Sequence, residues 1–431
     1  MRYSKNNSQL KVITTRIGIL IWSICALFYA FEFFLRSSTN ALAPIFHSTF
    51  GFNATATSII GSSFYWFYVI AQLPAGICVD KFGIKKVMII ATLVTSIGML
   101  FFTFSYLPWQ FTLSRAMIGF GGGFAFISSL KAAAMWLPNR MFPTFAGLTQ
   151  LFGYLGGAAS GLPLIMLLQT LSLSRVLMII FGITIIIFLL SILFIKTHPE
   201  YSSGSTAKYE NKSLKDIINS YLVLMKNPQL LINGLYCLCI CGTTAIFADL
   251  WGITYFQKVY GYSSETAAYA CSLIFLGVAF SSPMWGIIAT IIDNNKKLLV
   301  VASAIGIVIL SVLLYVKVNI IILCILCFLF GTIQSVHVLN FTIIARQVSK
   351  EKLGMGIAFI NLFIPLSGAI LQPISGFIIQ ICKNTSMGSI MVYKISMLII
   401  PILLLIATIL GLAFKENKKL EKKVVYSTTP P

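Results

Sequence analysis

Twelve long apolar segments dominate this chain of 431 residues. Each one is long enough to cross the roughly 30 Å hydrocarbon layer of a bilayer as a helix. The segments are residues 17–46, 56–79, 87–106, 109–137, 144–168, 175–195, 230–256, 264–291, 298–315, 319–345, 353–381 and 392–414. Membrane barrels are built from alternating strands of roughly ten residues. Continuous apolar runs of this length therefore predict an all-α membrane protein with twelve transmembrane helices.

The composition excludes the main classes of soluble protein. Only 10% of the residues are charged and 58% are hydrophobic, whereas soluble domains carry about 25% charged residues. The sequence shows no nucleotide-binding loop, no metal-ligand cluster and no serine–histidine–aspartate arrangement, and its polar segments are too short for a catalytic domain. The nine cysteines lie in or beside apolar segments, where we expect them to pack between helices. We expect a protein that is not an enzyme and that uses no cofactor and no metal ion.

The positions of the basic residues predict how the chain lies in the membrane. The formal net charge of +20 resembles that of a nucleic-acid-binding protein, but the basic residues lie between the apolar segments. When the segments alternate across the bilayer, 23 of the 31 Lys and Arg fall on the side of the N-terminus and 5 on the other side. Cytoplasmic loops carry this excess, so we predict that both termini are cytoplasmic and that nucleic acid is not a partner. Glu32 and Arg36 inside the first segment favour a retained helix over a cleaved signal peptide.

The longest polar segment divides the twelve spans into six and six. We expect an N-terminal six-helix bundle at 1–195, a cytoplasmic linker at 196–229, a C-terminal six-helix bundle at 230–414 and a basic cytoplasmic tail at 415–431. Proline, glycine and serine in the linker suit a flexible connector. Within the linker, residues 214–225 are expected to form a short amphipathic helix at the membrane surface.

An internal repeat supports this division. The matched residues, separated by 209 to 211 positions, are Gly76 and Gly286, Lys85 and Lys296, Lys86 and Lys297, Gly147 and Gly356, Gly157 and Gly368, and Pro163 and Pro373. Parallel repeats of this kind build transporters whose two halves rock around a central site. The repeat therefore predicts two pseudo-symmetric bundles.

The loop after the second span has the sequence Gly-Ile-Cys-Val-Asp-Lys-Phe-Gly-Ile-Lys-Lys over residues 76–86. Together with the twelve spans, this loop resembles the loop motif of the major facilitator superfamily, and the resemblance covers nearly the whole chain. It implies that the aspartate docks a neighbouring helix end, that the second glycine permits a tight turn, and that the lysines hold the cytoplasmic side. The residues of this conformational loop motif are Gly76, Asp80, Gly83, Lys85 and Lys86.

Spans four and five carry further family-like residues. Arg115, Gly119 and Gly121 are similar to the family's Arg-x-x-x-Gly-x-Gly pattern in span four. Span five lacks the Gly-Pro pair typical of the family's drug and proton antiporters. The resemblance therefore implies a solute importer of the bacterial inner membrane, and it makes a drug/proton antiporter the less favoured interpretation.

Few ionisable side chains lie deep inside the predicted spans, where a charge costs at least about 2.5 kcal/mol on insertion scales. They are Glu32 and Arg36 in span one, Arg115 and Lys131 in span four, Asp249 in span seven and His337 in span ten. In the family that this chain resembles, spans one, four, seven and ten line the central cavity. From the helical rise we expect Glu32 near the midplane; Arg36, Arg115 and Asp249 lie about 8–13 Å toward the outer side, and Lys131 and His337 about 8–12 Å toward the cytoplasm.

Two interpretations are open for the acidic residues. Glu32 and Arg36 are four residues apart, so they share one face of a helix and could neutralise each other. Alternatively both face the cavity, where Glu32 accepts a proton and Arg36 alternates between Glu32 and the substrate. Asp249 is either a second proton site or the partner of a neighbouring helix.

The basic residues of spans four and ten also have two interpretations each. Arg115 is a structural family residue bonded to helix ends, with a coupling role as a further option. Lys131 has no acidic partner on its own helix, so we expect it to bind an anionic group of the substrate; the alternative is that it extends to the cytoplasmic surface. His337 either contacts a neighbouring helix or binds the substrate.

The charges favour an anionic or zwitterionic small-molecule substrate, because three fixed positive charges face two acids. We expect proton coupling by Glu32 and Asp249, and substrate binding by Arg36, Arg115, Lys131, His337, Asn340, Gln150, Asn361 and Gln372. Aromatic side chains that could shape an apolar pocket are Phe33, Tyr65, Trp66 and Trp251.

These expectations combine into one functional prediction. The chain is expected to be a secondary active transporter that imports a small amino acid or an organic carboxylate together with protons, by alternating access and as a monomer in the lipid bilayer. The alternatives are a proton-independent facilitator and an exchanger of anions or phosphate esters.

Overall fold

The computed structural model describes residues 2–196, 219, 222–292, 294–348 and 353–415. These residues are almost entirely helical, and none of them lies in a β-strand. The expected amphipathic helix at 214–225 and the expected basic tail at 415–431 fall largely outside the described residues.

Within each half of the chain, most helices follow one another with short connections. Those of the first half are α1 (Arg2–Ser48), α2 (Ala54–Thr103), α3 (Pro108–Gly122), α4 (Ala125–Trp136), η1 (Asn139–Met141), α5 (Phe142–Ala159), α6 (Leu162–Thr170) and α7 (Leu173–Phe194). Those of the second half are α10 (Pro228–Ile246), η2 (Phe247–Trp251), α11 (Gly252–Tyr260), α12 (Ser264–Ile292), α13 (Asn295–Tyr315), α14 (Ile320–Gln334), η3 (Ser335–His337), α15 (Val338–Gln347), α16 (Leu353–Lys383), α17 (Ser389–Ser396) and α18 (Ile399–Leu412).

The predicted membrane spans are present as long apolar helical stretches. In the described chain, 11 stretches are long and apolar enough to cross a membrane. The longest, α2, has 50 residues and contains two of the predicted spans, which meet at a kink at Gly83. The prediction of an all-α membrane protein with twelve spans is therefore confirmed.

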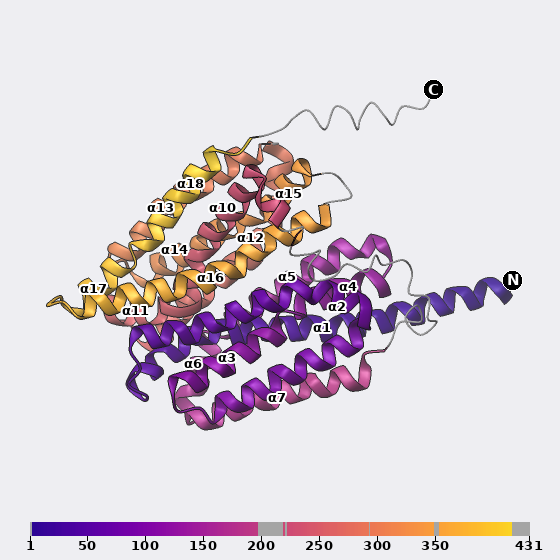
Figure 1. The fold of residues 1–431 in the computed structure, drawn as a ribbon, viewed down its shortest axis with the longest axis horizontal. Coiled ribbons are helices and arrows are strands. Elements are labelled where there is room, and N and C mark those ends of the chain that lie inside the picture. Colours follow the sequence, from indigo (N-terminus) through magenta and orange to yellow (C-terminus); the bar gives the residue numbers. More distant parts are fainter. Residues whose placement is uncertain (1, 197–218, 220–221, 293, 349–352, 416–431) are drawn as a thin grey trace.

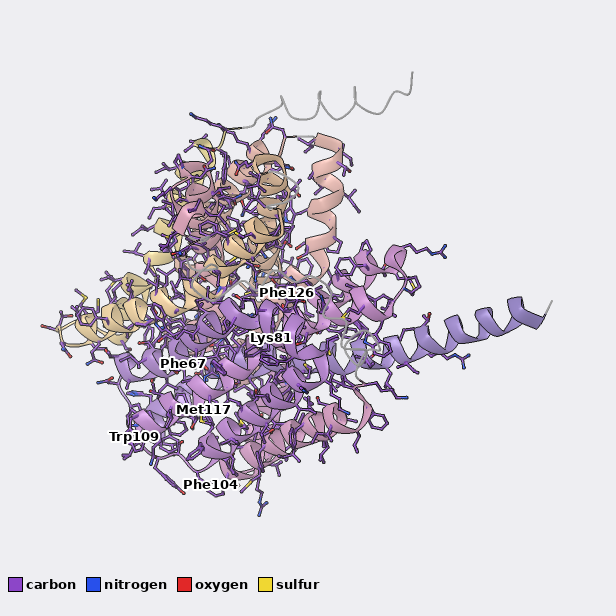
Figure 2. All side chains as sticks on the ribbon, turned by 45° about the vertical axis from the view of Figure 1, so that its right-hand side comes forward. Phe67, Lys81, Phe104, Trp109, Met117 and Phe126 are labelled. Carbon is purple, nitrogen blue, oxygen red and sulfur yellow. The ribbon has the colours of Figure 1, made fainter. Side chains whose placement is uncertain are left out.

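Lipid-facing side chains cover the outside of the molecule. Phe104 and Trp109 lie at the rim of the first half, next to the connection between α2 and α3 (Figure 2). Their side chains are 55% and 62% exposed. Large exposed apolar residues are expected where a helix contacts lipid, and tryptophan is enriched at the membrane–water boundary.

The helices form two bundles, one from α1–α7 and one from α10–α18 (Figure 1). In the first bundle α2 packs along α3 and α7, and α1 packs on α4 and α5. In the second bundle α10 packs along α16 and α18, and α12 packs on α14. The bundles contact each other mainly through α2 with α16, α5 with α12, and α1 with η2 and α11.

Two of the repeated glycines contact the opposite bundle in matching ways. A methyl group built on Gly157 of α5 would lie 2.8 Å from the Phe275 ring of α12. One built on Gly368 of α16 would lie 2.7 Å from the Tyr65 ring of α2. The two glycines are 211 positions apart and the two aromatic residues 210, so the pseudo-symmetry of the two halves extends to their interface.

The bundles meet at one face of the molecule and diverge at the other. We call the face where α1 begins the basic face, because the loop lysines at 81, 85, 86, 296 and 297 belong to it, and we call the other one the opposite face. Figure 1 shows the bundles in contact toward the end where α11 and α17 lie, and apart toward the end where the N-terminus lies. Contacts near the opposite face are close, since a methyl group on Gly376 of α16 would lie 2.0 Å from Ser58 Oγ of α2.

Replacing Gly83 with alanine is expected to lower the thermal stability of the purified protein. Gly83 has φ 77° and ψ 158°. In this conformation any residue with a side chain is strained by about 1–3 kcal/mol. The unfolding midpoint, measured by fluorescence-detected size-exclusion chromatography after heating, should fall. Gly76→Ala is the matched control, because a methyl group at that position meets no atom within 4 Å. Equal midpoints for the two variants would contradict this account of the kink.

Candidate functional site

Asp249 joins the two bundles at the centre of the protein. Its carboxylate accepts a hydrogen bond of 2.5 Å from Ser37 Oγ and one of 2.6 Å from Tyr65 OH. The carboxylate belongs to η2 in the second bundle, whereas both donors belong to the first, on α1 and α2. Asp249 is 4% exposed, so these bonds compensate for its removal from water. We call Asp249, Ser37 and Tyr65 the inter-bundle tie.

The helix around Asp249 is widened into a single π-helical turn, Phe247–Trp251. Such turns leave backbone groups without their usual partners and are frequent at functional sites. Asn40 of α1 supplies partners, because its Nδ2 donates to the carbonyl of Ala248 at 2.7 Å and its Oδ1 accepts from the amide of Ile253 at 3.0 Å. The first bundle therefore stabilises the unusual turn that presents Asp249.

A small cavity of about 50 Å³ lies between the bundles beside the tie. Arg36, Tyr65, Tyr154, Thr244, Asp249, Gln334 and Ser367 are its polar lining residues. Its apolar lining residues include Phe33, Phe275, Val278 and Ile364. The cavity thus draws on both bundles, and half of its described lining residues are polar. We call it the central cavity.

Arg36 is the positive charge of the central cavity. Its guanidinium carbon lies 3.6 Å from the centre of the Phe33 ring, a cation–π contact. The side chain is half-buried, and its Nε has no hydrogen-bond partner. No nitrogen–oxygen contact within 4 Å joins it to Glu32 or to Asp249. The guanidinium therefore retains hydrogen-bond donors that an anion in the cavity could occupy.

Glu32 lies one turn away from Arg36 but inside the first bundle. It is 1% exposed, and neither carboxylate oxygen has a hydrogen-bond partner. The side chain packs against Gly122, where an added methyl group would lie 2.6 Å from Glu32 Cγ. The structure contains neither arrangement expected for this pair, because Glu32 forms no ion pair with Arg36 within 4 Å and does not line the central cavity.

Arg115 braces helix α1. Its two terminal nitrogens donate to the carbonyls of Leu35 and Arg36 at 2.5 and 3.0 Å, and its guanidinium lies 4.8 Å from the centre of the Phe64 ring. With 2% of its surface exposed, it does not line the central cavity. These contacts correspond to the structural interpretation, in which Arg115 holds the backbone that carries Arg36.

Lys131 was expected to bind the substrate, but it contacts the loop motif instead. Its ammonium forms a 2.7 Å ion pair with Asp80 of the loop motif, and it does not line the central cavity. The acidic partner of Lys131 is not on its own helix, because Asp80 belongs to α2. Asp80 was expected to dock a neighbouring helix end, and its contact in the structure is instead with a side chain within α4 of the same bundle.

The other expected substrate ligands lie outside the central cavity. His337 Nδ1 lies 2.9 Å from the carbonyl of Gln334, and Asn340 Nδ2 donates to Cys237 Sγ at 2.9 Å. Gln150, Gln372 and Asn361 are likewise absent from the cavity lining: Gln150 accepts from Tyr29 OH at 3.0 Å, Gln372 donates to the carbonyl of Ala245 at 2.8 Å, and Asn361 is half-buried on α16. Most of these amides therefore form hydrogen bonds with other protein groups. The prediction failed because helix spacing alone does not show which face of a span meets a neighbour.

Several residues of the candidate site were missed by the sequence analysis. Ser37 and Asn40 carry the contacts to Asp249 and η2, and Tyr154, Thr244 and Ser367 line the cavity. One available signal was the unbroken polar run at 36–40, which is unusual in an apolar span. The aromatic expectation was also partly wrong, because Trp66 is 43% exposed on the outside of α2.

Comparison with known proteins agrees with this architecture. The sequence matches the Major Facilitator Superfamily over residues 24–370 and 253–429. The chain belongs to the major facilitator superfamily. As a member of this superfamily, with 11 apolar helical stretches in its described residues that are long enough to cross a membrane, it is a multi-pass membrane protein.

Among the relatives of this superfamily protein, two are named as probable transporters of organic acids and a third as a membrane sensor protein. The chain is 24% identical to a probable sulfoacetate transporter of Cupriavidus necator over 44% of each chain. It is 27% identical to a probable galactarate/D-glucarate transporter of Pseudomonas putida over 29% of each chain. It is 25% identical to a membrane sensor protein of Salmonella typhimurium over 61% of each chain. The aligned parts cover less than two thirds of each of these relatives.

A solved structure shares the fold across almost the whole chain. A bacterial homologue of the human lysosomal transporter Spinster, in an inward-facing and unoccupied conformation, superposes with a TM-score of 0.74 at 13% sequence identity. The match covers 92% of this chain and 98% of that one. At this identity the likeness concerns the fold of the superfamily.

Neutralising either Asp80 or Lys131 is expected to lower the thermal stability of the protein. A variant in which the two residues exchange charges is expected to keep that stability. Both side chains are partly exposed, at 35% and 24%, so their coupling should be modest, about 0.2–1 kcal/mol. Asp80→Asn and Lys131→Gln should each lower the unfolding midpoint, and Asp80→Lys combined with Lys131→Asp should recover it. If the exchanged variant kept its stability but bound no substrate, Lys131 would instead be a substrate ligand.

Proposed function

We propose that this protein is a proton-coupled importer of a small organic carboxylate or sulfonate. The observation that carries the proposal is the Arg36 guanidinium, which lies in the central cavity between the bundles without an acidic partner within 4 Å. A half-buried positive charge in this cavity favours an anionic ligand, since the pair of charges is cheaper to bury than either alone. The sulfoacetate and galactarate/D-glucarate transporters among the relatives support the same class of substrate.

The remaining lining gives the substrate an orientation. Gln334 Oε1 is buried without a hydrogen-bond partner, so it can accept from a hydroxyl or ammonium group of the substrate. Phe33 and Phe275 form apolar walls. A molecule with an acidic group at one end and a hydroxyl or amino group at the other fits this arrangement, which keeps a small amino acid as the second candidate.

The two buried acids are in different surroundings, which suits proton coupling. Asp249 accepts two hydrogen bonds from the other bundle, whereas neither carboxylate oxygen of Glu32 has a hydrogen-bond partner. Protonation of Asp249 would weaken the inter-bundle tie, because a neutral acceptor forms weaker hydrogen bonds. We propose that proton movement between these acids and water changes how tightly the bundles meet.

The orientation follows from the sequence. If the basic face is cytoplasmic, as the distribution of Lys and Arg predicts, the bundles diverge toward the cytoplasm and the structure is inward-facing. We propose a monomer of the bacterial inner membrane with both termini in the cytoplasm. The bundles at 1–195 and 230–414 would rock about the central cavity, connected by the linker at 196–229.

Removing the charge of Arg36 is expected to reduce uptake of the anion. Loss of a charge-assisted hydrogen bond, about 1.5–3 kcal/mol, corresponds to a roughly 10- to 150-fold fall in uptake efficiency for Arg36→Gln. The fall in uptake efficiency is measured with radiolabelled sulfoacetate and galactarate in proteoliposomes. Arg175→Gln, at an exposed arginine of α7 near the opposite face, is the matched control.

Three results would contradict the proposal. Equal uptake by the Arg36 and Arg175 variants would show that the guanidinium is not a ligand. Binding of these anions without any uptake by the wild-type protein would favour a sensor. Uptake restricted to neutral sugars or drugs would exclude an anionic substrate.

Neutralising the buried acids is expected to uncouple transport from protons. Asp249→Asn and Glu32→Gln should each abolish accumulation driven by an inward proton gradient, while retaining exchange of labelled for unlabelled substrate. Exchange needs no net proton movement and therefore serves as the internal control. Wild-type accumulation that is unaffected by a protonophore would contradict coupling of transport to protons. A proton-independent facilitator or an exchanger would then be the remaining interpretation.

A further inference from the structure

A second and larger cavity, of about 350 Å³, lies at the opposite face, where the two bundles meet. The first bundle contributes His47 near the end of α1. The second bundle contributes Thr254 and Lys258 of α11 and Lys383 at the end of α16. Closure of the bundles at this face therefore does not eliminate the space between them. We call this cavity the vestibule.

The vestibule concentrates positive charge on a side of the protein that has little of it. Only 5 of the 31 Lys and Arg belong to the opposite face, and two of these five, Lys258 and Lys383, line this one cavity. Lys258 and Lys383 thus place two like charges in the lining of one cavity, where like charges repel each other. None of the described lining residues is acidic. The repulsion would be relieved by an anion between the lysines.

Thr254 provides an independent indication of a ligand. Its side chain is 7% exposed, lines the vestibule, and its hydroxyl has no hydrogen-bond partner. Threonine in a membrane helix commonly donates to a carbonyl one turn earlier, and a buried hydroxyl without a partner is unfavourable. The orphaned hydroxyl therefore lies in the same space as the two lysines and is free to donate to an anion.

The vestibule is separated from the central cavity by the π-helical turn η2. Asp249 lines the central cavity and Trp251, two residues later, lines the vestibule. Trp251 is held in place, because its Nε1 donates to Ser375 Oγ at 3.0 Å. The two cavities thus lie on either side of one short segment of the second bundle.

We propose that the vestibule is a second anion-binding site, which holds a small carboxylate or sulfonate at the opposite face while the route to the central cavity is closed. Lys258 and Lys383 bind the acidic group and Thr254 donates a hydrogen bond to it. His47 Nδ1 donates to the carbonyl of Phe52 at 3.1 Å, which orients the imidazole ring in the cavity wall. Binding here needs no residue of the central cavity, so this proposal goes beyond the proposed transport reaction.

The test measures galactarate binding to the purified full-length protein by isothermal titration calorimetry at low ionic strength. The Arg36→Gln variant weakens binding in the central cavity, so remaining binding that is lost when Lys258 and Lys383 are also replaced belongs to the vestibule. We expect Arg36→Gln to bind galactarate with about one site per chain. Adding Lys258→Gln and Lys383→Gln should weaken that binding at least about tenfold, and the uncharged analogue galactitol should not bind. Binding should also weaken as potassium chloride is added, since the attraction is between charges.

The matched control adds Lys317→Gln and Lys394→Gln to Arg36→Gln, because these two lysines also belong to the opposite face but do not line the vestibule. It should bind galactarate as Arg36→Gln does. An Arg36→Gln protein that binds no galactarate would overturn the vestibule, whatever the wild-type protein transports. Equal loss in the control and vestibule variants would overturn it too, by showing a general effect of charge. Binding by Arg36→Gln together with an inactive wild-type transporter would overturn only the proposed function.

Discussion

The structure depends on the cost of leaving a polar group without a partner where no water is present. In a bilayer every backbone and side-chain donor or acceptor must find its partner inside the protein. Asp249 finds two hydroxyl donors on another bundle, and Arg115 finds two backbone carbonyls of α1. Polar groups that other helices satisfy therefore determine how the helices are placed. Atoms that remain without a partner, such as Glu32 Oε1 and Oε2 and the Thr254 hydroxyl, indicate where a proton or a ligand belongs.

The π-helical turn η2 is the point where these requirements meet. It interrupts the seventh span, presents Asp249 to the first bundle and depends on Asn40 for two backbone hydrogen bonds. The central cavity lies on one side of this turn and the vestibule on the other. A change in the protonation of one carboxylate would therefore act directly on the segment that separates the two spaces. This arrangement relates the coupling of the bundles to the accessibility of the central cavity.

The residues of the site were predictable to different degrees. Arg36 and Asp249 stand out in the sequence because a charge in an apolar span is rare, and both line the central cavity. Ser37 and Asn40 were missed because small polar residues are tolerated in membrane helices and carry no comparable signal. Lys131 was assigned to the substrate because its partner, Asp80, is 51 positions away on another helix. Pairing across helices depends on rotation and depth, which hydropathy does not report.

By itself the sequence determined the number of spans, the division into two related halves and the superfamily, because bilayer thickness imposes a minimum length on each apolar run and the repeat is visible along the chain. Tertiary structure alone decided which ionisable side chains share a cavity, which are paired, and which face of the molecule is closed. The physical reason is that one helix can present any of its faces to a neighbour without changing its hydropathy. Only packing, as in the contact of Gly368 with Tyr65, selects the face that meets the other bundle.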